Sequence, residues 1–458
     1  MKFHSKAIVE HDEVPLADDG QWEQLIEHWA ARHSGPGQPG TEGTRCYVVS
    51  VGDWGDEVER DAQLAEILGL VRAQGNPVVG HETLRRARPE PRTYLGRGAA
   101  SQIAARAREQ GATMLVVDAE LSPSQTRNLE DVAGLSVCDR EAVILDVFAR
   151  HARTRKARIQ VEIAHLEYLR PRIRGLGLDM DQQTGGMVKA RGPGETASEL
   201  LARRLDGRLA ELRKQFARLV RAGVTQRKAR EASARVVLVG YTNAGKTSLM
   251  NALTDAGLSA RDLPFETLDT TSRCLTRHGG DVIISDTVGF IRRLPARLLE
   301  SFQTTLAEIV EASLVTVVVD LSDPEWRMHV ETTDAQIAEL GAASLPRLYV
   351  FNKVDRVPGP PPAEALRAAT GGRPFAVVSS HDPEATARLR ERLVSMARHD
   401  HERARLFVPY EATELLALIY AQCRVLEAEA VERGQVLTIE GATQAVARLR
   451  RAAKEARA

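Results

Sequence analysis

The chain has 458 residues, which is too long for one ordinary domain and suggests about three. Its 43% hydrophobic and 27% charged residues are typical of a globular protein, and its 62 basic and 62 acidic residues favour no particular partner. No apolar run approaches the roughly 18 residues that a membrane-spanning helix needs. The four cysteines form no CxxC pair and the N-terminus shows no leader pattern, so we expect a cytoplasmic protein with reduced thiols and no membrane span.

The first part of the chain is expected to hold a flexible segment followed by an α/β subdomain. Residues 1–43 end in a stretch rich in glycine and proline, which is typical of an irregular segment. Over residues 44–139, short apolar runs such as CYVVSVG and TMLVVD alternate with amphipathic helical patterns, among them the capped helix SPSQTRNLEDVAG. This alternation predicts a parallel sheet covered by helices.

Residues 140–234 are expected to form a basic antiparallel helical hairpin. Two long stretches carry apolar residues at three-to-four spacing, and the glycine-rich stretch between them, residues 171–195, shows neither a helical nor a strand period, so we expect a loop there. Between Arg150 and Arg235 there are 21 Lys or Arg against 9 Asp or Glu, an excess of 12 positive charges. This charge suits a phosphate-backbone surface, although a solvated helix face is the competing interpretation.

Residues 235–399 show the alternating pattern again and contain a phosphate-binding motif. Gly240 to Thr247 read GYTNAGKT, which fits GxxxxGK[ST] between a predicted strand and a predicted helix. Backbone N–H groups in such a loop bind phosphate, the lysine neutralises β- and γ-phosphate charge, and the threonine hydroxyl can ligate Mg²⁺. A chance glycine-rich turn does not explain the flanking strand and helix. Residues 400–458 predict a small C-terminal α/β module.

Three further motifs follow in the order of a GTP-binding domain. DTVG places Asp286 where it can reach Mg²⁺ through water and the Gly289 amide where it can contact a γ-phosphate. In NKVD, the Asp355 carboxylate can accept two hydrogen bonds from guanine, a pair that adenine does not offer. The SSH segment can contact guanine O6 through backbone N–H groups. The candidate nucleotide-binding residues in these motifs are Gly240, Tyr241, Thr242, Asn243, Ala244, Gly245, Lys246, Thr247, Asp286, Thr287, Val288, Gly289, Asn352, Lys353, Val354, Asp355, Ser379, Ser380 and His381.

The motifs GYTNAGKTSLMNALT, PFETLDTTSR, DTVGFIRRLP and FNKVD, with TYLGRGA, ELSPSQTRNLE and RGPGET upstream, resemble the HflX family of translational GTPases across roughly residues 44–450. The resemblance implies an N-terminal α/β subdomain with a helical hairpin, a central G domain and a small C-terminal domain. It also implies that the hairpin loop reaches RNA of the large ribosomal subunit. The stretches GGMVKARGPGE and GPGETASE depart from the family's common GGxGxRGPGE and GPGETQLE, and Thr270 stands where a proline is common.

The same resemblance assigns switch I to Phe265, Glu266, Thr267, Leu268 and Asp269. Thr267 matches the threonine that ligates Mg²⁺ beside Thr247, with Thr270 and Thr271 as rivals for that role. Asn243 matches the asparagine that binds K⁺ in some GTPases, although an asparagine also suits a tight turn.

The residue that follows Gly289 is Phe290, where many small GTPases carry a glutamine that orients the attacking water. An apolar side chain cannot orient water, so we expect slow GTP hydrolysis by the protein alone and stimulation by the ribosome.

The sequence therefore predicts a monomeric Mg²⁺-dependent GTPase that binds the large ribosomal subunit in its GTP state, dissociates or rescues ribosomes, and leaves in its GDP state. A GTP-dependent RNA chaperone or ribosome-assembly factor is the alternative, because it would use the same G domain on free RNA. A scaffold that binds GTP with negligible turnover is a third hypothesis, which the basic hairpin disfavours.

Overall fold

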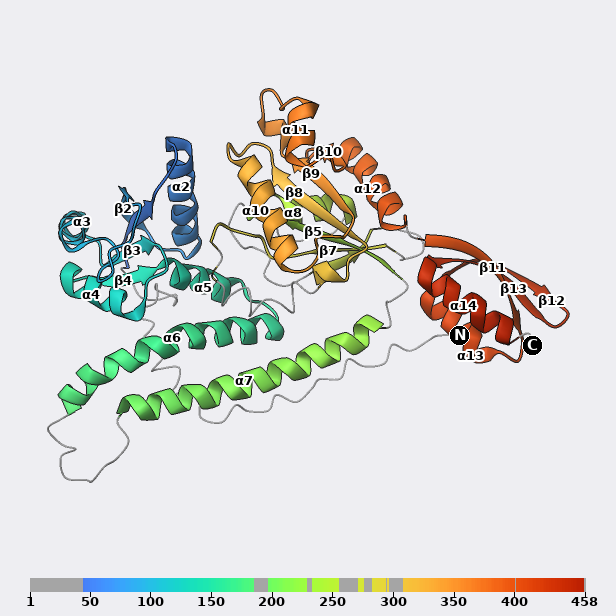
Figure 1. Ribbon diagram of the computed structural model, residues 1–458, viewed down its shortest axis with the longest axis horizontal. Coiled ribbons are helices and arrows are strands. Elements are labelled where there is room, and N and C mark those ends of the chain that lie inside the picture. Colours follow the sequence, from blue (N-terminus) through green and yellow to red (C-terminus); the bar gives the residue numbers. More distant parts are fainter. Residues whose placement is uncertain are drawn as a thin grey trace, which may run out of the picture.

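The computed structural model describes residues 44–184, 197–228, 233–254, 271–275, 282–293, 295, 308–399 and 401–456. The expected N-terminal segment, switch I and the second part of the expected hairpin loop lie outside these residues. Figure 1 shows two α/β units side by side, a pair of long helices running below them, and a small module at the far end of the molecule.

The N-terminal unit, β1 to α5, is built on a parallel four-stranded sheet in the order β2-β1-β3-β4. Helices cover both faces, with α2 and α5 on one and α3 and α4 on the other. In the predicted capped helix α4, the Ser122 hydroxyl and the Gln125 side chain form a capping box. The elements are β1 (Cys46–Gly52), α2 (Glu57–Ala73), β2 (Val78–Arg85), α3 (Arg97–Glu109), β3 (Met114–Asp118), α4 (Pro123–Ala133), β4 (Ser136–Asp139) and α5 (Arg140–His151). The parallel α/β prediction for this part of the chain is confirmed.

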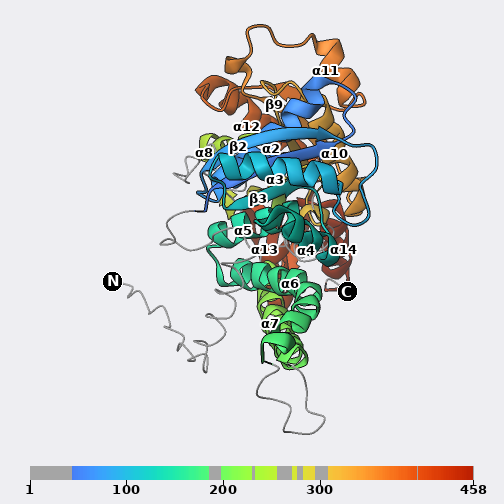
Figure 2. The same cartoon turned by 90° about the vertical axis from the view of Figure 1, so that its left-hand side faces the viewer.

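Two long helices, α6 (Arg155–Thr184) and α7 (Ala197–Lys228), run side by side and extend below the N-terminal sheet (Figure 2). Helix α5 ends at His151 and is a separate element, which packs on α2 and β3 in the N-terminal unit and also on α6. The loop expected over residues 171–195 begins later, since α6 continues through Pro171 to Thr184. Glycine costs a helix only about 1 kcal/mol relative to alanine, so the glycines of this stretch disfavour a helix without excluding it.

The P-loop unit, β5 to α12, has a six-stranded sheet in the order β10-β9-β8-β5-β7-β6, in which only the edge strand β6 is antiparallel. Strands β5 and β7 are neighbours, so the loops that follow them meet at one edge of the sheet. The described elements are β5 (Ala234–Gly240), α8 (Lys246–Thr254), β6 (Thr271–Cys274), β7 (Val282–Asp286), β8 (Leu314–Asp320), α10 (Trp326–Glu339), β9 (Arg347–Asn352), the 3₁₀ turn η1 (Val354–Arg356), α11 (Ala363–Ala369), β10 (Phe375–Val377) and α12 (Pro383–Ala397).

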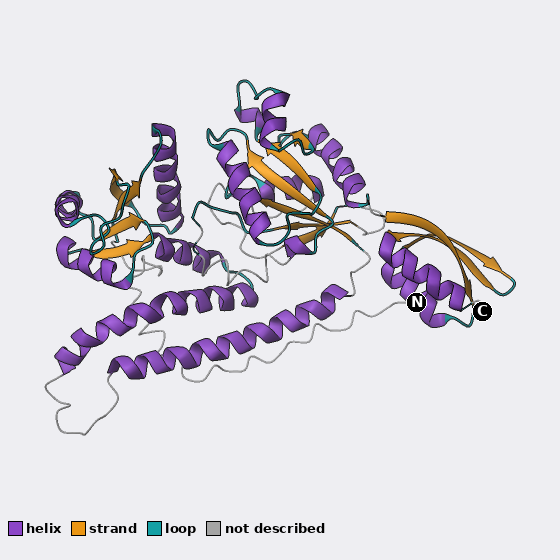
Figure 3. Cartoon of the chain, viewed as in Figure 1, coloured by secondary structure: helices purple, strands orange, loops and turns teal. Residues whose placement is uncertain are grey.

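The C-terminal module packs two helices on one face of a three-stranded antiparallel sheet in the order β11-β13-β12 (Figure 3). Its elements are β11 (His401–Pro409), α13 (Thr413–Gln422), β12 (Arg424–Val431), β13 (Gly434–Ala442) and α14 (Thr443–Glu455). These elements agree with the small α/β module that the sequence predicts over residues 400–458. Among the described residues, the structure contains no helix with the length and apolarity needed to cross a membrane.

One continuous cluster of buried side chains joins three of these parts. It includes Val48 and Phe148 of the N-terminal unit, Leu166 of α6, and Phe290 and Trp326 of the P-loop unit. Burial of apolar surface stabilises such contacts by about 25 cal/mol per Å². The N-terminal unit is therefore packed against the P-loop unit and is not merely tethered to it.

Candidate functional site

The loop between β5 and α8 has a backbone that only glycine can follow at two positions. Gly240 has φ +147°, and a Cβ atom there would lie 2.1 Å from the Val318 carbonyl oxygen of β8. Gly245 has φ +87°, and its Cβ would lie 2.4 Å from Asn352 Nδ2. Because both glycines are closely surrounded, the loop packs tightly against the ends of the strands. Its N–H groups lie at the N-terminus of α8, an arrangement that suits anion binding.

Lys246, Thr247 and Asp286 meet at the end of this loop. Lys246 Nζ donates to the carbonyl oxygens of Gly240 at 3.1 Å and Tyr241 at 2.9 Å. Burial lowers the pKa of Lys246 to about 8, and the Asp286 carboxylate acts in the opposite direction. Thr247 Oγ1 donates to Asp286 Oδ2 at 2.7 Å, so a hydroxyl and a carboxylate oxygen stand together at the ends of two neighbouring elements.

This pair of oxygens fits the chemistry of Mg²⁺. Magnesium prefers hard oxygen ligands and is usually held through one or two carboxylates together with substrate phosphates, not by a cage of protein side chains. In the described part of the chain no group of three or more His, Cys, Asp and Glu side chains could hold a metal, which is compatible with such a sparse ligand set. Thr267, the other ligand expected from the family resemblance, lies outside the described residues.

Asn352 and Lys353 fasten the P-loop to the end of β9. Asn352 is fully buried, and its Nδ2 donates to the Ala244 carbonyl at 3.1 Å while its Oδ1 accepts from the Ser380 N–H at 3.1 Å. Lys353 Nζ donates to the Asn243 carbonyl at 2.7 Å and pairs with Asp320 at 2.7 Å. One asparagine therefore joins the P-loop to the loop after β10.

Replacing Asn352 with alanine is expected to weaken nucleotide affinity at least tenfold. The change leaves the Ala244 carbonyl and the Ser380 amide without their partner, and each unpaired buried group costs about 1–3 kcal/mol. Titration of purified protein with fluorescent GDP measures the loss. Asn128→Ala is the matched control, because Asn128 Nδ2 donates to the Arg92 carbonyl at 2.9 Å in the N-terminal unit. Equal affinities for the two variants would contradict the role of Asn352.

The residues expected to contact a base lie on two adjacent loops. Asp355 is exposed in η1, and a hydrogen bond from the Ser379 hydroxyl lowers the pKa of its carboxyl group. The Ser379 Oγ also accepts from the His381 N–H at 3.2 Å, which shapes the turn that precedes α12. The structure thus brings Asp355 and the Ser379–His381 segment together, with Val354 between Lys353 and Asp355 in the same turn.

The segment from Asp286 to Gly289 and beyond, which by the family resemblance is switch II, leaves the end of β7 and lies directly against the P-loop. Phe290 N donates to the Gly240 carbonyl at 3.0 Å, and the Thr242 N–H donates to the Phe290 carbonyl at 2.7 Å. The Phe290 side chain is 1% exposed and belongs to the buried cluster, so it points away from the phosphate-binding face. Upstream, the Thr287 hydroxyl donates to the Leu238 carbonyl at 2.7 Å, and Val288 is buried.

Asn243 is exposed and adopts φ +61° in the P-loop turn. Asparagine tolerates this left-handed conformation better than most residues, which gives the turn interpretation a physical reason. The role in K⁺ binding stays a prediction.

Sequence reasoning missed a set of contacts between the site and the N-terminal unit. The Tyr241 ring of the P-loop stacks on His329 of α10 at 3.8 Å between centroids, and its hydroxyl bonds Glu66 of α2. Arg140 of α5 donates to the Arg292 carbonyl in switch II at 2.7 Å. A buried arginine beside two carboxylates has no signature in the sequence, because its partners lie 22, 74 and 152 positions away.

Family models match most of the chain in consecutive segments. One described as GTP-binding GTPase N-terminal matches residues 61–149, one described as GTP-binding GTPase Middle Region matches residues 151–230, and one described as 50S ribosome-binding GTPase matches residues 235–353. A solved structure of a GTP-binding protein from Sulfolobus solfataricus in complex with GDP is 20% identical, has a TM-score of 0.43, and the match covers 78% of this chain and 99% of that one.

Curated relatives match over the same range. A protein of Gluconacetobacter diazotrophicus named GTPase HflX is 38% identical over 437 residues, covering 86% of this chain and 94% of that protein. Another of that name, from Spirochaeta thermophila, is 42% identical over 320 residues, covering 69% of this chain and 78% of that protein. On the strength of these matches across the N-terminal unit, the hairpin helices and the P-loop unit, the chain belongs to the HflX family of GTPases.

Proposed function

We propose that this GTPase binds the large ribosomal subunit in its GTP state, dissociates or rescues ribosomes, and leaves after hydrolysis in its GDP state. The observation that carries the proposal is the exposed basic face of α7, a helix of 32 residues that runs below the two α/β units in Figure 1. The family model over residues 235–353 bears the description 50S ribosome-binding GTPase, which supports the same partner.

In this proposal the P-loop, from Gly240 to Thr247, holds the phosphates, and Asp355 with the Ser379–His381 segment holds guanine. Thr247 and Thr267 would ligate Mg²⁺ and Asp286 would reach it through water; the ion neutralises phosphate charge when bound. The Gly289 amide would contact the γ-phosphate. The loops that the γ-phosphate orders make such a site a two-state device.

The described parts of α6 and α7 support an RNA-facing role for the hairpin. Three ion pairs join the two helices: Glu162 with Arg208, Glu167 with Arg213, and Arg170 with Asp206. Other basic side chains remain exposed along α7, namely Arg203, Arg204, Lys214, Arg218 and Arg221. Contacts of Lys and Arg with phosphates supply most of the sequence-independent affinity for nucleic acid and weaken as salt rises. The exposed face of α7 is therefore suited to the RNA of a large subunit.

The test is the GTP hydrolysis rate of the purified protein, alone and with isolated large ribosomal subunits. We expect slow turnover alone and strong stimulation by the subunit, because the buried Phe290 cannot orient the attacking water. Equally slow turnover in both samples would count against the ribosome as the activating partner.

A charge reversal on α7 tests where the subunit binds. We expect Lys214→Glu combined with Arg218→Glu to weaken subunit binding at least tenfold at about 0.15 M salt and to lower the salt slope by about one for each lost phosphate contact. Arg367→Glu with Arg388→Glu makes the same charge change at exposed positions on α11 and α12 and is expected to have little effect. A similar loss of subunit affinity in both double variants would show that only the net charge of the protein matters, and not the position of the charges on α7.

The alternative function is a GTP-dependent RNA chaperone or assembly factor, which the same basic face would serve. The two functions differ in the preferred ligand. A ribosome-directed factor binds assembled subunits more tightly than protein-free ribosomal RNA at physiological salt, whereas a chaperone binds the naked RNA at least as well.

A further inference from the structure

A chain of contacts connects switch II to the N-terminal unit. The Arg140 guanidinium is 2% exposed and donates to Asp118 at 2.6 Å, to Glu66 and to the Arg292 carbonyl. The Tyr241 hydroxyl donates to the other Glu66 oxygen and accepts from the Arg292 N–H at 2.7 Å. Both backbone polar groups of Arg292 are thus held, one by the N-terminal unit directly and one through the P-loop tyrosine.

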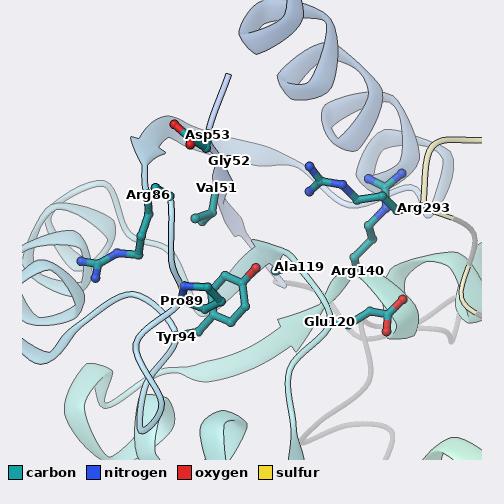
Figure 4. Close-up of a pocket in the computed structure, with 11 residues that line it drawn as sticks. Val51, Gly52, Asp53, Arg86, Pro89, Tyr94, Ala119, Glu120, Arg140 and Arg293 are labelled. Atoms are coloured by element: carbon teal, nitrogen blue, oxygen red, sulfur yellow. The ribbon is translucent and has the colours of Figure 1, made fainter. Parts of the chain in front are cut away.

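The next residue of switch II also borders the N-terminal unit. Arg293 adopts φ +47°, a left-handed conformation that a long side chain keeps only where its surroundings hold it. With Arg140, it lines a pocket of about 500 Å³ at the carboxyl ends of β1 and β3. Figure 4 shows the two arginines on one side of this pocket and Arg86 on the other. Switch II therefore contacts the N-terminal unit through its backbone, and the Arg293 side chain borders a pocket of that unit.

Switch II lies directly over the P-loop at Gly289. A Cβ atom at Gly289 would lie 2.9 Å from the Thr242 Cα and 3.0 Å from Lys246 Nζ. The lysine ammonium is the end of a flexible side chain, but Thr242 belongs to the P-loop backbone, and its N–H donates to the Phe290 carbonyl at 2.7 Å. A γ-phosphate that contacts the Gly289 amide adds a group beside this close approach, so we expect switch II to shift when GTP binds, and the contacts of Arg292 oppose that shift. GDP lacks the γ-phosphate and makes no such demand.

We propose that Arg140 and Glu66 are positioning residues for switch II, which hold it against the P-loop and thereby lower the affinity of the site for GTP relative to GDP. A contact that must break for one ligand and not for the other shifts their relative affinity by its own free energy. The N-terminal unit thus sets the nucleotide preference of a site to which it contributes no ligand.

The experiment measures the affinities of the full chain for fluorescent GDP and for a non-hydrolysable GTP analogue. In Arg140→Gln, the Asp118 carboxylate keeps hydrogen bonds from Gln63 at 2.7 Å and Ser50 at 3.3 Å. We expect the ratio of GTP-analogue affinity to GDP affinity to rise about fivefold or more. An unchanged ratio overturns the proposal. The proposal rests on guanine-nucleotide binding by the wild type, and failure of the wild type to bind either nucleotide would instead refute the proposed function.

Arg172→Gln is the matched control, because Arg172 is also a buried arginine of the N-terminal region paired with a buried aspartate, Asp139. Arg172 contacts Tyr168, Leu121 and Asp139, which all lie in the N-terminal region, so the affinity ratio of Arg172→Gln should stay within about twofold of the wild type. If Arg140→Gln and Arg172→Gln change the ratio of GTP-analogue to GDP affinity equally, the change would come from lost stability alone, and the proposal would be overturned.

If Arg140→Gln does not fold, the variant Tyr241→Phe tests the same proposal. It removes the hydroxyl that links Glu66 to Arg292 and keeps the ring that stacks on His329. We expect the same direction of change in the affinity ratio. In the double variant Tyr241→Phe with Glu66→Gln, the change in the affinity ratio should be smaller than the product of the two single changes, because both substitutions break the same link between Glu66 and Arg292. A combined effect equal to that product overturns the proposal.

Discussion

Replacing Asp355 with asparagine is expected to convert a site for guanine into a site for xanthine. The aspartate offers two acceptor oxygens to N1–H and the 2-amino group of guanine. Asparagine offers one acceptor and one donor, which match N1–H and the C2 carbonyl of xanthine. Each hydrogen bond to a charged group contributes about 1.5–3 kcal/mol, so the swing in preference between the two bases should reach about a thousandfold.

Competition of GDP and xanthosine diphosphate for a fluorescent nucleotide measures this change. Asp382→Asn is the matched control, because Asp382 caps α12 on the neighbouring loop by accepting from the Glu384 and Ala385 N–H groups. Asparagine is an equally good cap, so this variant should stay folded and keep its preference for guanine. An Asp355→Asn variant that still prefers GDP would show that the carboxylate does not contact the base.

Replacing Arg172 with alanine is expected to destabilise the N-terminal region by about 3–5 kcal/mol. Arg172 is almost fully buried, donates to Asp139 at 2.7 Å and to the Leu121 carbonyl at 2.8 Å, and lies 3.5 Å above the Tyr168 ring. Its loss leaves the Asp139 carboxylate, 1% exposed, without a counter-charge. Chemical denaturation followed by circular dichroism measures the change.

The loss in free energy of unfolding caused by Arg172→Ala should become smaller as the pH falls. Burial raises the pKa of Asp139 even in the presence of Arg172, and removing that positive charge raises it further. A carboxyl group whose folded pKa exceeds its unfolded pKa destabilises the protein above the folded pKa, and this penalty disappears as protonation sets in below it. The difference from the wild type should therefore be smaller at pH 5 than at pH 8.

Arg170→Ala provides the control for Arg172→Ala. Arg170 stands two positions away on the same helix and pairs with Asp206, but its side chain is 48% exposed. An exposed pair of this kind contributes at most about 1 kcal/mol. A similar loss of stability in both variants would contradict the view that burial makes Arg172 important.

The sequence was sufficient for the order of the elements around the site because the P-loop, DTVG, NKVD and SSH segments each follow a short apolar run that predicts a strand. Parallel strands bring such ends to one edge of the sheet, so Thr247 and Asp286 could be expected near each other. The glycines at 240 and 245 likewise belong to a motif whose backbone requirement is known. Each of these signals lies within a short stretch of sequence, so it does not depend on how distant parts of the chain pack together.

The remaining features depend on partners that are distant in the sequence. Nothing near Arg140 or Glu66 indicates that they meet Arg292, since that contact arises only when two units pack together. The continuation of α6 through Gly175 was also missed, because glycines weakly disfavour a helix and the sequence shows no helical period there. The role of Asn352 in fixing the P-loop could not be predicted from the sequence either. The NKVD motif identifies the residue but does not indicate that its amide donates to the Ala244 carbonyl.

The hairpin has a mechanical property that follows from where it is anchored. The twelve residues of α6 that follow Arg172, up to Thr184, carry the helix about 18 Å further at 1.5 Å per residue. A helix held near its middle works as a lever, which multiplies any tilt at the point of support into a larger sweep at its end. The aim of that end therefore depends on the buried contacts that hold α6, among them Arg172 with Asp139, and on the ion pairs between α6 and α7.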